Sequence, residues 1–286
     1  MKDIDCVAFL QWALPRLNLR WPGFRRVRGQ VCKRIDRRIQ ALGLSGRDAY
    51  IAYLADKPGE WDILDSLCYI SISRFYRDRA VFDCLGDTVL PELAEQAGRR
   101  TNGLVRCWSA GCASGEEPYT LNLVWEQRVS PRFPQTGLAI LATDIDEHLL
   151  ERARIGCYPA SALKELPRAW IERAFSRNDG AYCLRDEWRG RVEFRWQDIR
   201  AEHPPGEFDL ILCRNLAFTY FDKQLQLLTL ERLTERVRAD GFLVIGRHES
   251  LPSSECLSPL AASLGIYRKT QPFPPFGGEG ACLSAV

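Results

Sequence analysis

The stretch Leu104-Val105-Arg106-Cys107-Trp108-Ser109-Ala110-Gly111-Cys112-Ala113-Ser114-Gly115-Glu116-Glu117 decides the fold of this 286-residue chain. It begins with an apolar run that is typical of a strand, passes through a loop of small residues, and leads into a helix expected from residue 116 to about 127. A strand joined to a helix by such a tight loop is typical of the first unit of a parallel α/β sheet.

Strands and helices continue to alternate on the C-terminal side of this stretch. Apolar runs predict buried strands at residues 138–143, 208–213 and 242–246, and helices are expected at residues 147–154 and 223–238. This order predicts the α/β fold class, with a mostly parallel, doubly wound sheet. Before the third strand, residues 181–184 and 191–194 are expected to pair with each other around a polar turn at 186–190, as a small antiparallel insertion.

The first hundred residues are expected to be helical. Val31, Ile35 and Ile39 recur at helical spacing, and Gly43 ends that helix. The predicted division is a helical N-terminal domain with its linker at residues 1–98, a second domain at 99–270 with an insertion at about 156–191, and a flexible tail at 271–286. The tail is expected to be disordered because it is rich in Pro and Gly.

Composition argues against several classes of site. The eleven cysteines are scattered, with no Cys-x-x-Cys pair, and are expected to be reduced, buried thiols rather than disulfides. The three histidines lie far apart, so no metal centre and no histidine-based hydrolase is expected. No run approaches the roughly 18 apolar residues of a membrane span. Asp3 and Asp5 replace the basic start of a signal peptide, and a cytoplasmic location is therefore expected.

Polar side chains follow three of the predicted strands, where open α/β sheets bind their ligands. The loop after the first strand carries Glu116 and Glu117, which can take a cationic amino group, although a tight turn explains its small residues equally well. Asp144 ends the second strand, where an acid can bind two ribose hydroxyls or cap a helix. Arg214 and Asn215 end the third strand. These groups predict a site for an adenosine-containing ligand, and the lack of a phosphate-binding lysine favours S-adenosylmethionine over a nucleotide.

Four motifs also resemble those of a known family. In chain order they are Ile72-Ser73-Arg74-Phe75-Tyr76-Arg77-Asp78, Ser109-Ala110-Gly111-Cys112-Ala113-Ser114-Gly115-Glu116-Glu117-Pro118-Tyr119, Ala142-Thr143-Asp144-Ile145-Asp146 and Phe208-Asp209-Leu210-Ile211-Leu212-Cys213-Arg214-Asn215. The motifs and their order resemble those of the CheR family of chemotaxis-receptor methyltransferases. The resemblance covers about residues 27 to 268. The resemblance implies a Rossmann-like methyltransferase domain, a helical N-terminal domain and a small β-subdomain at the insertion. It also implies S-adenosylmethionine as cofactor and methyl transfer to glutamate side chains of a protein.

The resemblance further implies a set of site residues. The expected cofactor-binding residues are Ser73, Arg77, Glu117, Asp144, Asp198, Ile199, Arg214 and Asn215. Among them Glu117 would face the methionine amino group, Asp144 the ribose, and Ile199 the adenine. The acceptor carboxylate is already ionised at neutral pH, so the reaction needs no general base. It needs the carboxylate to be held in line with the methyl group, and Arg77 is the expected catalytic anchor through a bidentate pair.

The second expected catalytic residue is a tyrosine near the end of the third strand. The family's pattern after Cys-Arg-Asn is one residue shorter than 216–222 of this chain, so its tyrosine corresponds to Thr219 without a gap or to Tyr220 with one. Tyr220 is preferred because Phe221-Asp222 then follow in register. The altered segment leaves two alternatives open, a methyltransferase with another acceptor and a silent regulatory protein that binds cofactor without turnover.

A basic segment between residues 16 and 38 points to a partner. It carries nine basic residues and a single acid, Asp36, and should attract an acidic surface. The resemblance implies that Arg34, Arg37 and Arg38 face an acidic, chemoreceptor-like helix, although a solvated face explains the charges equally well. Nucleic acid is an unlikely partner, since no aromatic residues interleave regularly with the arginines.

Overall fold

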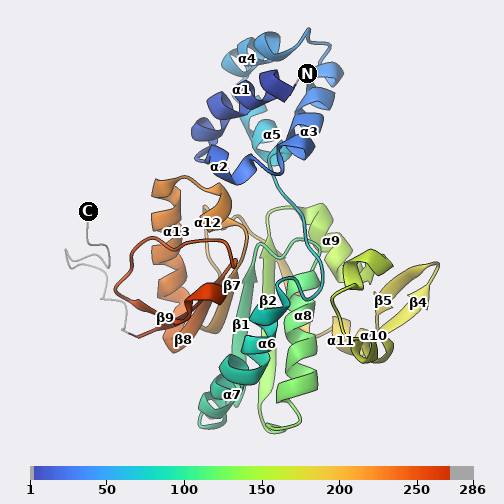
Figure 1. The fold of residues 1–286 in the computed structure, drawn as a ribbon, viewed down its shortest axis with the longest axis vertical. Coiled ribbons are helices and arrows are strands. Elements are labelled where there is room, and N and C mark those ends of the chain that lie inside the picture. The colour runs from blue at the N-terminus through green and yellow to red at the C-terminus, as the bar shows by residue number, and fades with distance from the viewer. Residues whose placement is uncertain (1–2, 271–286) are drawn as a thin grey trace. The chain divides into compact units, whose positions relative to one another are not determined.

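The computed structural model describes residues 3–270, and the chain folds into two compact units (Figure 1). The first unit comprises the residues up to Ser71 together with Thr219–Gln226, and the second comprises Ile72–Phe218 and the residues from Leu227 on. The tail expected at residues 271–286 lies outside the described residues. Between residues 3 and 270 no helix is both long enough and apolar enough to cross a membrane.

The first unit is helical. Its elements are α1 (Asp3–Ala13), the 3-10 turn η1 (Leu14–Leu17), α2 (Trp21–Phe24), α3 (Arg28–Ala41), α4 (Arg47–Asp56) and α5 (Glu60–Leu67). Val31, Ile35 and Ile39 of α3 are all buried, which confirms the apolar face predicted for that helix. An antiparallel bridge between Leu19 and Phe221 brings residues 219–226 into this unit.

A seven-stranded sheet forms the centre of the second unit. Its strands lie in the order β6 (Val192–Trp196), β2 (Gly137–Asp144), β1 (Leu104–Ala110), β7 (Phe208–Cys213), β8 (Val237–Ile245), β10 (Ile266–Lys269) and β9 (Leu257–Ala261). The first five strands are parallel, and β10 runs antiparallel to β8 and β9. Every residue of β7 is buried, as expected of a central strand covered on both faces. The predicted α/β fold class is confirmed.

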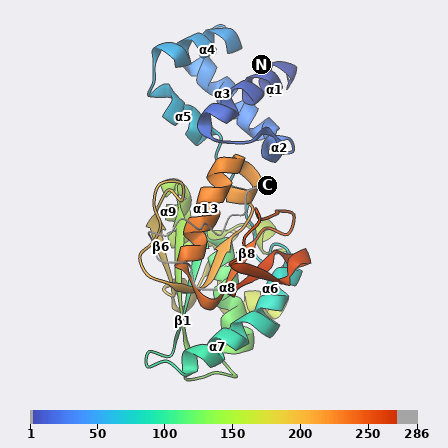
Figure 2. The same ribbon diagram turned by 90° about the vertical axis from the view of Figure 1, so that its left-hand side faces the viewer.

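Helices cover both faces of this sheet. α8 (Glu116–Val124) and the π-type segment η3 (Trp125–Val129) connect β1 to β2, whereas α12 (Ala217–Tyr220) and α13 (Lys223–Arg236) connect β7 to β8. These two connections run in opposite directions across the sheet. Because such crossovers are right-handed, α8 and α13 lie on opposite faces, as Figure 2 shows. The strand order reverses between β1 and β7, which is where open sheets of this kind bind ligands.

Three helical segments before β1 also belong to the second unit. They are α6 (Arg79–Cys84), the π-type segment η2 (Leu85–Val89) and α7 (Leu90–Gly98). Phe82, Leu85 and Leu93 are buried in the same core as Val105 of β1. The division between the compact units therefore falls after Ser71 instead of at the expected residue 98, because these helices bury their apolar faces against the sheet.

The segment between β2 and β6 contains a smaller antiparallel sheet. After α9 (Glu147–Ile155), its strands pair in the order β3 (Cys157–Tyr158), β5 (Ala181–Leu184) and β4 (Phe175–Asn178), with η4 (Ala160–Leu163), α10 (Arg168–Ala174) and α11 (Asp186–Arg189) around them. The expected pairing of residues 181–184 with 191–194 is wrong. Residues 192–196 instead pair in parallel with β2, because a strand there covers the open edge of the main sheet, and the expected turn at 186–190 is the helix α11.

Among residues 3–270, two pairs of cysteines are bonded to each other, so the expectation of reduced thiols is wrong for them. Cys6 of α1 is joined to Cys32 of α3, and Cys157 of β3 is joined to Cys183 of β5. Sequence spacing gives no sign of either bond, because helix packing and strand pairing bring the partners together. Among the described residues the free thiols include Cys68, Cys84, Cys107, Cys112 and Cys213.

Candidate functional site

The loop between β1 and α8 is fixed by its glycines and by the end of β2. The backbone N–H groups of Gly111 and Cys112 both donate to the carbonyl of Thr143, at 2.8 and 3.0 Å. Gly111 and Gly115 have φ angles of 76° and 90°, which favour glycine. A Cβ at Gly111 would lie 2.4 Å from Leu216 Cδ2. The glycines therefore serve the tight turn and its packing, which was one of the two explanations open for them.

Asp144 ends β2 with both carboxylate oxygens bonded to backbone N–H groups. Oδ2 accepts from Ala113 in the loop after β1, at 2.8 Å, and Oδ1 accepts from Asp146, at 3.0 Å. Burial raises the pKa of this carboxyl, and the backbone N–H donors of Asp146 and Ala113 oppose that rise. The N-cap of α9 is Asp146, whose side chain accepts from His148 and Leu149. Asp144 is thus not the helix cap, and its carboxylate joins the loop after β1 to the end of β2.

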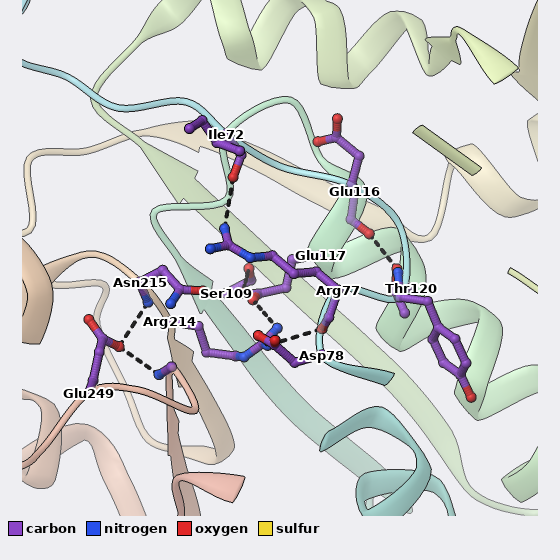
Figure 3. A network of polar contacts seen from close by, with 12 residues as sticks. Ile72, Arg77, Asp78, Ser109, Glu116, Glu117, Thr120, Arg214, Asn215 and Glu249 are labelled. Atoms are coloured by element: carbon purple, nitrogen blue, oxygen red, sulfur yellow. Dashed lines mark hydrogen bonds and ion pairs between the residues drawn. The ribbon is translucent and has the colours of Figure 1, made fainter. Parts of the chain in front are cut away.

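Glu117 lies in the first turn of α8, and its carboxylate is also held at both oxygens (Figure 3). Ser109 Oγ of β1 donates to Oε1 at 2.8 Å, and Arg214 Nη1 donates to Oε2 at 3.0 Å. The negative charge of Glu117 is therefore fixed between the ends of β1 and β7. A carboxylate with an imposed orientation in this place can receive a cationic amino group.

Arg214, directly after β7, connects three segments of the second unit. Its Nη2 donates to Asp78 Oδ2 at 2.7 Å and to the carbonyl of Arg77 at 3.1 Å. The side chain is only 2% exposed, and its guanidinium lies 5.2 Å from the centre of the Phe82 ring. Within residues 3–270 its Nε has no hydrogen-bond partner although it is buried. A buried donor without a partner indicates a place where a ligand acceptor can bind.

Asn215 has left-handed backbone geometry, with a φ angle of 57°. Its N–H donates to Glu249 Oε2 at 2.8 Å, and the N–H of Gly246, directly after β8, donates to the same oxygen at 2.6 Å (Figure 3). Glu249 thus ties the ends of β7 and β8 together. Glu249 is not among the predicted site residues, although its segment, Gly246-Arg247-His248-Glu249, directly follows a predicted strand and in this respect resembles the other site segments.

The segment containing Ser73 and Arg77 runs past the same strand ends. Tyr76 and Asp78 have φ angles of 58° and 60°, a conformation that costs an L-residue roughly 1–2 kcal/mol. Arg77 lies between them, and its Nη1 donates to the carbonyl of Ile72 at 2.8 Å. Ser73 and Arg77 are both partly exposed. Arg214 links the backbone of Arg77 to Glu117, so the structure brings these two predicted site residues together.

Asp198 and Ile199 follow β6 and are tied to the end of β2. The N–H of Gln197 donates to the carbonyl of Asp144 at 3.0 Å, which places this segment next to Asp144. Ile199 is 7% exposed and is suited to an apolar surface. The Asp198 carboxylate is bonded to the backbone N–H and the guanidinium of Arg200.

Tyr220 belongs to the first compact unit. Its ring lies 5.0 Å from that of Phe24, centre to centre, and its carbonyl accepts from the N–H of Arg20 at 2.8 Å. The neighbouring Thr219 carbonyl accepts from Arg20 Nε at 3.0 Å. The expected catalytic role of Tyr220 stays a prediction.

Two of the three arginines expected on the binding face of α3 make contacts within the first unit. Arg34 donates to the carbonyls of Leu67 and Tyr69, and Arg38 forms a bidentate pair with the buried Glu60, at 2.9 and 2.7 Å. Both side chains therefore make contacts that hold the helices of this unit together. The exposed cations of the segment include Arg26, just before α3, and Lys33 and Arg37 within it. Lys33 and Arg37 are four residues apart within α3, which puts them on one side of the helix.

The assembled groups fit S-adenosylmethionine. A carboxylate in the first turn of α8 and another at the end of β2 suit an ammonium group and two hydroxyls. Ile199 offers an apolar surface for a base, and the unpartnered Nε of Arg214 offers a donor. Glu117, Asp144 and Arg214 would therefore hold the cofactor.

Comparison with known proteins agrees with these features. Residues 71–263 match the model of a family described as CheR methyltransferase, SAM binding domain. A chemotaxis protein methyltransferase of Listeria monocytogenes is 36% identical over 186 residues, covering 65% of this chain and 68% of the relative. Those of Salmonella typhimurium and Escherichia coli are 33% and 31% identical over 236 residues, covering 78% and 80% of this chain and 76% and 78% of the relatives.

Proposed function

The chain belongs to the CheR methyltransferase family and uses S-adenosylmethionine, and we propose that it methylates glutamate side chains of a chemotaxis-type receptor. The observation that supports this best is the pair of oriented carboxylates, Glu117 and Asp144, on adjoining strand ends of the second unit. The relatives named as chemotaxis protein methyltransferases support the choice of acceptor. A cytoplasmic location is part of the same proposal.

The chain's own residues have to bind and align the reactants. S-adenosylmethionine supplies, when bound, a methyl group on a positively charged sulfur. In the transfer, a carboxylate oxygen forms a bond to the methyl carbon while the bond between carbon and sulfur breaks, and its electron pair stays on sulfur. Glu117 would hold the amino group and Asp144 the ribose. Arg77 would exchange its bond to the Ile72 carbonyl for the acceptor carboxylate and hold that group in line.

Transfer of labelled methyl groups tests this function directly. The purified protein is incubated with methyl-labelled S-adenosylmethionine and receptor-rich membranes, and the label on protein is measured before and after mild base. We expect mild base to release the label as methanol, because methyl esters of carboxylates hydrolyse in mild base. Methyl groups on amides or amines are not released under these conditions. Base-stable label would indicate another acceptor. Cofactor binding with no transfer would favour the silent regulatory protein.

Binding of S-adenosylhomocysteine is expected to weaken as the pH falls. Burial raises the pKa of Asp144 in the free protein, and two ribose hydroxyls can donate only to the ionised carboxylate. The bound ligand therefore favours loss of the proton, and affinity should be constant above that pKa and fall below it by at most about tenfold per pH unit. Calorimetric titrations between about pH 7.5 and pH 5 measure this profile. Asp144→Asn should bind S-adenosylhomocysteine weakly, and its affinity should not change with pH over this range. The same slope of affinity against pH in both proteins would assign the effect to another titrating group.

The acceptor surface is expected to include Lys33 and Arg37 of α3. Both are exposed cations four residues apart, and an acidic receptor helix would be attracted to them. Replacing both with glutamate should raise the KM for receptor membranes about tenfold, leave kcat within about twofold, and reduce the salt dependence of KM, since charges at the rim of an interface act mainly on encounter. Lys57→Glu, an exposed cation elsewhere in the same unit, is the matched control. Equal KM values for the double variant and the control would exclude this face.

A further inference from the structure

Tyr76 stands directly before Arg77 and is held at both ends. Its backbone N–H donates to Thr120 Oγ1 of α8 at 3.0 Å, and its hydroxyl donates to Asp83 Oδ1 of α6 at 2.7 Å. The ring is completely buried and packs against Phe82. A bulky residue keeps a left-handed backbone conformation only where its surroundings impose it, and these contacts do so at Tyr76.

Arg128 of η3 completes the cluster around the hydroxyl of Tyr76. Its Nη2 donates to that hydroxyl at 3.0 Å and to Asp83 Oδ1 at 2.7 Å, and its Nη1 donates to Asp87 Oδ1 at 3.3 Å. The guanidinium also lies 5.6 Å from the ring centre of Trp170. Tyrosine, aspartate and arginine thus form a closed set of charge-assisted hydrogen bonds, which are stronger than neutral ones.

The backbone around this cluster leaves Arg128 little freedom. A Cβ at Gly86 of η2 would lie 2.9 Å from Arg128 Cδ and 2.8 Å from Val124 Cγ1, so the arginine side chain packs directly on the helix backbone. Both η2 and η3 are π-type segments, which are rare within helices and frequent near functional sites. Asp87 of η2 and Arg128 of η3 are hydrogen-bonded to each other, so the cluster joins the two π-type segments.

We propose that Tyr76 is a positioning residue for Arg77, with Arg128 and Asp83 fixing its hydroxyl. The backbone turns on each side of Arg77, at Tyr76 and at Asp78, and each turn has its own anchor. The turn at Tyr76 is held by the hydrogen bonds of Tyr76 to Thr120, Asp83 and Arg128. The turn at Asp78 is held by its bond from Arg214 (Figure 3). Arg77 therefore extends from a rigid support. The inference rests on the proposed function in one respect, which is that Arg77 is one of the residues that bind the cofactor.

A double-mutant cycle on cofactor affinity separates positioning from simple stabilisation. S-adenosylhomocysteine is titrated calorimetrically into the wild type, Tyr76→Phe, Arg77→Ala and the double variant, with thermal unfolding recorded for each. Arg77→Ala should weaken binding about tenfold through loss of a charge-assisted hydrogen bond. Tyr76→Phe should weaken it about fivefold in the wild type and less than about twofold in Arg77→Ala, because coupled residues are not additive.

The control is Tyr182→Phe, which removes a hydroxyl bonded to Arg177 in the smaller sheet and should leave affinity unchanged. If Tyr76→Phe does not fold, Arg128→Gln replaces it in the same cycle. Equal effects of Tyr76→Phe with and without Arg77, or no effect of Arg77→Ala, would overturn the inference while cofactor binding by the wild type stands. A folded wild type that does not bind S-adenosylhomocysteine would overturn the proposed function and the inference together.

Discussion

Asp144→Ala is expected to weaken the binding of S-adenosylhomocysteine by about a hundredfold or more. The substitution removes an ionised acceptor for two ribose hydroxyls, and each hydrogen bond to a charged group contributes about 1.5–3 kcal/mol. It also removes the bond from Asp144 Oδ2 to the N–H of Ala113, which connects the loop after β1 to the end of β2. Isothermal titration calorimetry of the purified, folded variant measures the loss.

The matched control is Asp146→Ala, two residues along the chain. Asp146 caps α9, so its loss should cost about 1 kcal/mol of stability and change the affinity for S-adenosylhomocysteine by less than about threefold. If Asp144→Ala bound within threefold of the wild type, the ribose would lie elsewhere. The roles of Glu117 and Ile199 would then need another explanation, since both were assigned around the same ligand.

Arg214→Met should destabilise the second unit by about 3 kcal/mol, since removing one partner of a buried ion pair leaves the others without compensation. Arg214 is almost fully buried and holds Asp78 and Glu117, which are themselves mostly shielded from water. Equilibrium unfolding in urea measures the free energy of unfolding. The expected direction is a lower midpoint with little change in slope.

Arg154→Met provides the comparison for this second substitution. Arg154 pairs with Glu147 on the surface, where both side chains are more than two-fifths exposed, and its loss should cost less than about 1 kcal/mol. Similar midpoints for the two variants would show that Arg214 contributes no more than a surface pair. In that case the network around Glu117 would be held by other contacts, such as the bond from Ser109.

The main sheet was predictable from sequence because its strands are buried on both faces. Runs such as 208–213 are apolar throughout, and no helix of the required length fits between their flanking turns. Strand pairing at the edge was not predictable, because apolar and charged residues alternate along the sequence of β6, as they would in a short hairpin strand. The cysteine bonds were not predictable for a related reason, since they depend on which elements become neighbours.

The site was predictable in the same uneven way. Asp144, Arg214 and Asn215 come at the ends of apolar runs, and Glu117 follows such a run after a short loop. The carboxyl ends of parallel strands meet at one edge of a sheet. The contacts that orient them were hidden. Nothing in the chain order indicates that Glu249 would bond to the N–H of Asn215, or that Tyr76 would take a left-handed conformation. Arg34 and Arg38 were placed on a binding face because charge alone does not show which cations the fold uses internally.

The helical unit has a consequence for how the chain is made. Its residues are not continuous, since it includes 219–226 as well as the segment up to Ser71, and the bridge between Leu19 and Phe221 joins the two. A ribosome therefore delivers the first part of this unit long before the piece that completes it. The strands β1, β2, β6 and β7 are all synthesised in between. The helical unit is therefore completed only after most of the second unit has been translated.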